Sequence, residues 1–97
     1  MDNDSQMIKV MSNALIDLQV KYRSSSVVDR MKILPDLEKL LNDFSKYQLN
    51  LLKEGIITTD DDLEEMAQIK RDIDAAANKQ QLLLAIGKTI VFIGKKI

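Results

Sequence analysis

Two stretches of the chain carry residue types that could bind phosphate or a metal ion. The first, Gly87-Lys88-Thr89, has the glycine, lysine and hydroxyl with which a phosphate-binding loop ends. That motif also needs an earlier glycine, and this chain has Leu82 there, within a helical pattern. We therefore interpret Gly87 as a small residue in a helix-packing seam and Lys88 as its solvated neighbour.

The second stretch is the acidic run from Asp60 to Glu65, whose oxygens would suit a hard cation. It lacks the alternating ligands, the glycine and the distal glutamate of an EF-hand loop. Carboxylates also stabilise the first turn of a helix, because the backbone N–H groups there carry the positive end of the helix dipole. The run therefore indicates the start of a helix, and we predict no metal site.

Histidine and cysteine are both absent from the chain. Imidazole acid–base catalysis, thiolate nucleophiles and the usual zinc ligands are absent with them. The serines at 24–26 have no histidine base and are interpreted as a turn. The carboxylates show no Glu-x-x-His pattern of a di-metal bundle. We therefore expect a protein that is not an enzyme and that has no cofactor.

The composition favours one all-α domain over residues 1–97. Hydrophobic residues make up 45% and charged residues 30%, which is typical of chains that fold. Three glycines and one proline are too few for the turns of a β-sandwich or barrel. A net charge of −1 argues against nucleic-acid binding, which needs a basic face. The acidic start Met1-Asp2-Asn3-Asp4 is unlike a signal peptide, so we expect a cytoplasmic protein.

Apolar residues at spacings of three and four predict two helices in the first half, over about 5–23 and 27–54. Ser26 should cap the second helix after a short antiparallel connection, and Gly55 should close it. At Pro35 the helix either continues with a kink or starts afresh with Pro35 in its first turn. We favour a helix that begins near residue 27 and is disturbed around 33–35. Its predicted core-facing stripe is wide and consists of Ile33, Leu34, Leu37, Leu40, Leu41, Phe44, Tyr47, Gln48 and Leu51.

The last stretch is predicted as one long helix over about 59–95, with Thr59 as its N-cap. At ~1.5 Å per residue it would be longer than its neighbours, and its apolar C-terminal part would overhang them. The expected fold is therefore a small antiparallel bundle of three helices that is completed by dimerisation. A break near Asn78 or Gly87 is the alternative, and it would fold a fourth helix back to give a monomeric bundle.

The C-terminal helix is the predicted contact with a second copy, as in a coiled coil. Gly87 and Gly94 would let a partner helix approach closely. The same apolar seam would also suit the core of the chain's own bundle. The predicted contact residues are Ile73, Ala76, Gln80, Leu83, Ile86, Gly87, Ile90, Ile93, Gly94 and Ile97.

The charges of this helix support a second hypothesis. From Ala75 onward the chain contains no acid and four lysines, which are Lys79, Lys88, Lys95 and Lys96. A helix with an apolar side and a cationic side can lie on an anionic membrane surface, although this one is too short to span a membrane. We therefore predict a protein–protein interaction protein that forms a homodimer. The alternative is a membrane-surface or toxin-neutralising protein of the immunity type, in which these lysines contact lipid or an acidic partner.

Overall fold

Four α-helices make up the bundle. The computed structural model describes residues 2–54 and 57–97. The helices are α1 (Asn3–Ser24), α2 (Val27–Glu54), α3 (Asp60–Ala75) and α4 (Lys79–Gly94). No strand occurs in these two ranges, so the prediction of an all-α fold is confirmed. The bundle measures 41 × 22 × 18 Å along its principal axes.

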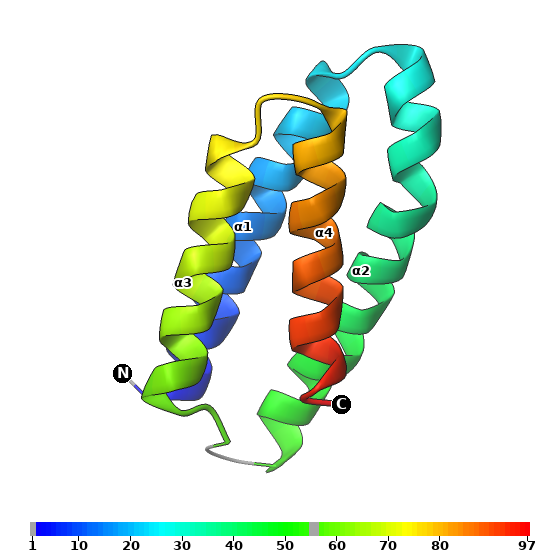
Figure 1. Cartoon of the computed structure of the whole chain (residues 1–97). Coiled ribbons are helices and arrows are strands. Elements are labelled where there is room, and N and C mark those ends of the chain that lie inside the picture. The colour runs from blue at the N-terminus through cyan, green and yellow to red at the C-terminus, as the bar shows by residue number, and fades with distance from the viewer. Residues whose placement is uncertain (1, 55–56) are drawn as a thin grey trace.

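The helices alternate in direction along the chain (Figure 1). α1 and α3 run parallel and pack side by side, as do α2 and α4, whereas α3 and α4 are antiparallel neighbours. The order around the bundle is therefore α1, α3, α4, α2. In this order α3 and α4 share one outer face of the molecule.

The first two helices lie close to their predicted ranges of 5–23 and 27–54. The Ser26 hydroxyl accepts a hydrogen bond from the Asp29 N–H at 3.2 Å, which confirms its predicted capping role. α2 continues through Pro35, so a helix that starts afresh there is excluded. The predicted closing residue Gly55 lies outside the described residues.

The prediction of one continuous helix over 59–95 is wrong, because the chain leaves the helix at residues 76–78. Asn78 caps α4, since its Oδ1 accepts the Gln81 N–H at 2.9 Å. Gln81 Oε1 in turn accepts the Ala77 N–H at 2.7 Å. This pair of bonds resembles a capping box. It satisfies the Gln81 N–H, which a new helix would leave unpaired, and the N–H of Ala77, which precedes the cap. The four-helix alternative therefore holds, and the expected overhang does not form.

A lysine of α1 supports the end of α3. The Lys21 ammonium donates to the backbone oxygens of Asp74 at 2.8 Å and Ala76 at 2.7 Å. The last carbonyls of a helix have no intrahelical partner, and no glycine stands here to close it locally. A side chain from a distant part of the sequence thus helps to set this boundary.

The core is mostly aliphatic and contains an aromatic pair near the end of the bundle at which α3 begins. The rings of Tyr47 and Phe92 meet edge to face, with 6.5 Å between centroids. The stripe that α2 contributes is narrower than predicted, since Leu34 is 39% exposed and Leu41 and Gln48 are only half-buried. The reason is that α2 packs mainly against α4 and less extensively against α1.

Candidate interaction surface

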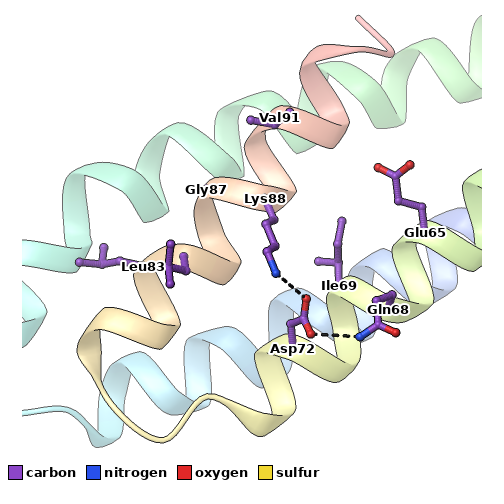
Figure 2. Close-up of a pocket in the computed structure, with 9 residues that line it drawn as sticks. Glu65, Gln68, Ile69, Asp72, Leu83, Gly87, Lys88 and Val91 are labelled. Carbon is purple, nitrogen blue, oxygen red and sulfur yellow. Dashed lines mark hydrogen bonds and ion pairs between the residues drawn. The ribbon is translucent and has the colours of Figure 1, made fainter.

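A groove runs between α3 and α4 on the outside of the bundle (Figure 2). We call it the α3–α4 groove, and its volume is about 570 Å³. Carbon atoms form most of its surface, and polar side chains stand at its edges. The lining residues are Glu65, Gln68, Ile69, Asp72, Leu83, Leu84, Gly87, Lys88 and Val91.

Gly87 opens the middle of the groove. A Cβ atom built at this position would meet no neighbouring atom within 4 Å, and the same holds at Gly94. Within the described part of the chain, close packing therefore does not require either glycine. A glycine inside a helix is less stable than alanine by ~1 kcal/mol. Gly87 thus weakens α4 without relieving a clash, and it leaves the α4 backbone open on the groove side.

Two large aliphatic side chains flank Gly87 on the solvent side of α4. Leu84 is 67% exposed and Val91 is 60% exposed. The opposite side of the same helix holds Ile86 and Ile93, which are completely buried. α4 therefore presents apolar side chains both towards the core and towards solvent, where Lys88 lies between Leu84 and Val91.

Ion pairs connect the two walls of the groove. Lys88 Nζ lies 3.2 Å from Asp72 Oδ2, and Lys95 Nζ lies 4.0 Å from Glu65 Oε2. Gln68 donates to the second Asp72 oxygen at 3.1 Å. These hydrogen bonds, from Gln68 and then Lys88, hold the pKa of Asp72 below its ordinary value. The groove thus has an acidic α3 side and a basic α4 side, with each acid level with a base.

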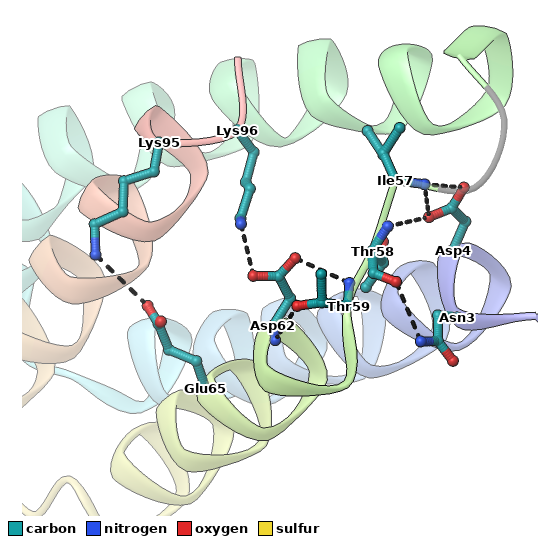
Figure 3. A network of polar contacts seen from close by, with 9 residues as sticks. All are labelled: Asn3, Asp4, Ile57, Thr58, Thr59, Asp62, Glu65, Lys95 and Lys96. Atoms are coloured by element: carbon teal, nitrogen blue, oxygen red, sulfur yellow. Dashed lines mark hydrogen bonds and ion pairs between the residues drawn. The ribbon is translucent and has the colours of Figure 1, made fainter.

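A second polar network joins the end of α4 to the start of α3 (Figure 3). Thr59 and Asp62 exchange hydrogen bonds of 3.1 Å in a capping box, which confirms Thr59 as the N-cap. Lys96 Nζ donates to Asp62 Oδ1 at 2.6 Å and lies 5.7 Å from the centroid of the Phe92 ring. Burial raises the pKa of Asp62, but the hydrogen bonds from Lys96 and Thr59 outweigh it and hold the pKa below its ordinary value.

The buried carboxylate of Asp4, on α1, accepts hydrogen bonds from the backbone of the residues that precede α3. It accepts the Ile57 N–H at 3.1 and 3.2 Å and the Thr58 N–H at 2.9 Å. Only 6% of Asp4 is exposed, so these N–H groups replace water as its partners. Its contacts explain this carboxylate structurally, and we assign it no ligand.

The residues predicted to contact a second copy fall into two groups. Ile73, Ile86 and Ile93 are 0% exposed and pack in the chain's own core, so they are not available for the predicted contact between copies. The break at 76–78 is the reason, because it folds α4 back and turns this seam inward. The others lie nearer the surface: Ala76, Leu83, Gly87 and Ile90 are half-buried, and Gln80, Gly94 and Ile97 are exposed.

Leu84 and Val91 are the most exposed aliphatic side chains of the groove, and neither is among the predicted contact residues. Those residues follow the apolar row that faces the core. A signal was available, because the run Leu82-Leu83-Leu84-Ala85-Ile86 is apolar at every position and must place apolar residues on all sides of a helix.

Three of the four lysines predicted to contact lipid or an acidic partner pair with acids of α3. Lys88, Lys95 and Lys96 lie within ion-pair distance of Asp72, Glu65 and Asp62, respectively. Lys79 lies at the other end of α4, beside the serine turn. The acids of α3 therefore balance much of the positive charge that the sequence of α4 alone displays.

Comparison of the chain with protein families, with curated proteins and with solved structures finds no match. Within residues 2–54 and 57–97, no group of three or more acidic side chains is placed to hold a metal ion. None of the described helices combines the length and the apolar character needed to cross a membrane. The functional interpretation therefore depends on the surface described above.

Proposed function

We propose that this protein is a non-enzymatic, cytoplasmic interaction protein that forms a homodimer through the outer face of α4. One observation carries the proposal, namely that Leu84 and Val91 stand exposed on either side of the open backbone at Gly87. Burial of apolar surface is favourable by ~25 cal/mol per Å², so covering this face would stabilise an assembly. The overhang predicted from the sequence is absent, because α4 folds back onto the bundle.

A membrane-surface or toxin-neutralising role is the alternative proposal. Its support is the position of Val91 beside Lys88 and Lys95, which places aliphatic and cationic groups on one face. The pairing of both lysines with acids of α3 reduces the attraction of this face to anionic lipid. We therefore favour contact with protein.

Sedimentation equilibrium of the full chain and of a Val91→Glu variant tests the proposal. Val28→Glu is a matched control, because Val28 is also 60% exposed but lies on α2. We expect the wild type and Val28→Glu to dimerise and Val91→Glu to be monomeric, with equal helix content by circular dichroism. A monomeric wild type, or a Val91→Glu variant that dimerises as well as the wild type, would overturn the proposal.

The same three proteins should be sedimented with vesicles that contain phosphatidylglycerol. A wild type that is monomeric and pellets with these vesicles would favour the lipid alternative. Val91→Glu removes apolar surface and adds a negative charge, so loss of pelleting in this variant but not in Val28→Glu would show that this face of α4 meets the lipid.

A further inference from the structure

We infer that the two copies pair with α4 of each lying over α3 of the other, about a two-fold axis parallel to the bundle. The inference rests on the proposed self-association and adds the geometry of the partner. It depends on the charges along the α3–α4 groove rather than on the apolar residues, which would allow several arrangements.

The ion pairs show which residues of α3 and α4 lie at the same position along the bundle axis. We call this position the height of a residue. Asp72 lies level with Lys88, and Glu65 lies close to level with Lys95. Because the helices are antiparallel, position 91 must then lie at about the height of position 69. Ile69 and Val91 both line the groove, which agrees with this register.

A closed two-fold interface brings the same surface of both copies together, so this surface must complement itself. Rotation about an axis parallel to the helices leaves every height unchanged and exchanges the α3 and α4 sides. Lys88 of one copy then faces the partner's Asp72, and Lys95 faces the partner's Glu65. At these two heights an acid of one copy therefore meets a lysine of the other. Between them, the Arg71 guanidinium donates to Gln68 at 2.8 Å and adds one base on the α3 side.

A two-fold axis across the helices would give a different result. It would set α4 against α4 in antiparallel fashion. With the axis at the height of Val91, Lys88 would face the partner's Lys95, and Asp72 would face the partner's Glu65. Like charges placed opposite each other across an interface oppose binding. Both arrangements would cover Leu84 and Val91, so charge complementarity selects the first.

The area of the face formed by α3 and α4 indicates how stable the dimer should be. Each of the two helices has 16 residues. Such a helix is ~24 Å long and ~10 Å wide, so the flat footprint of the pair is ~500 Å². A stable interface buries ~800 Å² of accessible surface per partner, and this face is smaller than that. We therefore expect a reversible dimer whose population depends on protein concentration and falls with added salt.

The chain contains no cysteine, so single introduced cysteines report contacts between copies without background. Gln68→Cys and Val91→Cys are the informative pair, because both positions line the groove and lie at similar heights on α3 and α4. Each variant is first sedimented to establish that it dimerises as the wild type does. The variants are then oxidised separately and as an equal mixture.

We expect the mixture to form a disulfide between positions 68 and 91 and each variant alone to stay uncrosslinked. Val28→Cys on α2 is the control for random collisions and should not crosslink. Efficient crosslinking within Val91→Cys alone, or no crosslink in a mixture that dimerises, would overturn the arrangement while leaving self-association intact. A wild-type chain that stays monomeric would instead refute the proposed function itself.

Discussion

Replacing Gly87 with alanine tests whether the α3–α4 groove is open space in the single chain. A Cβ atom there would meet nothing within 4 Å, so the added methyl group should cause no clash. Alanine is more stable than glycine inside a helix by ~1 kcal/mol, and Gly87→Ala should raise the free energy of unfolding by about this amount. For a chain of 97 residues, this corresponds to a melting temperature higher by ~4–8 °C.

The same methyl group should weaken self-association, because it occupies the surface over which the partner is proposed to pack. Thermal melts followed by circular dichroism at several concentrations separate the two effects. Gly87→Ala should melt higher than the wild type at low concentration and should depend less on concentration. Gly94→Ala is the control, because its Cβ is also unobstructed but it is the last residue of α4, where helix propensity matters less. A lower melting temperature of Gly87→Ala in dilute solution would refute the reasoning.

Three further substitutions test the contacts that hold the bundle together. Asp4→Ala should lower the free energy of unfolding by ~2–3 kcal/mol, because two backbone N–H groups lose their acceptor; an unchanged urea midpoint would contradict this. Asn78→Ala should destabilise by ~1 kcal/mol through loss of the α4 cap, whereas stabilisation would indicate one continuous helix. Lys96→Met should destabilise by ~1 kcal/mol at neutral pH. The pKa of Asp62 is lower in the folded chain than its ordinary value of 3.8, so the ion pair stabilises the fold above pH 3.8, and this stabilisation is lost as the pH falls through the folded pKa. A difference between the urea midpoints of the wild type and Lys96→Met that persists in acid would contradict the ion pair.

The helices of the first half could be predicted because their signals are local. The three-and-four spacing of apolar residues predicted α1 and α2, and the side chain of Ser26 caps the helix that directly follows it. The acidic start of α3 was predicted for the same reason, since Thr59 and Asp62 act on their own helix. The physical forces in these cases operate over one or two turns.

The break between α3 and α4 depended on a contact that local reasoning did not include. Lys21 of α1 binds carbonyl oxygens at the end of α3, and this partner is far away in the sequence. Asn78 and Gln81 did carry a local capping signal, but the uninterrupted alanines before them favoured a continuous helix. Because the helix breaks at residues 76–78, the segment predicted to overhang forms a fourth helix of the bundle.

The candidate surface was predicted only in part. Gly87 and Leu83 were selected from the sequence and do line the groove, whereas Ile73 and Ile86 are in the core. A helix that is apolar on every side has no periodic signal to distinguish its inner from its outer face. The side of α4 that faces the core is determined by its packing against α2 and α3.

Composition and short-range spacing suffice to predict the helical class, the two N-terminal helices and the apolar, lysine-containing character of the C-terminal segment, because these properties depend on residues close together in the chain. The tertiary structure decided which side of α4 faces solvent and which acids meet its lysines. These features depend on contacts between residues distant in sequence, and those contacts form only when the helices fold against one another.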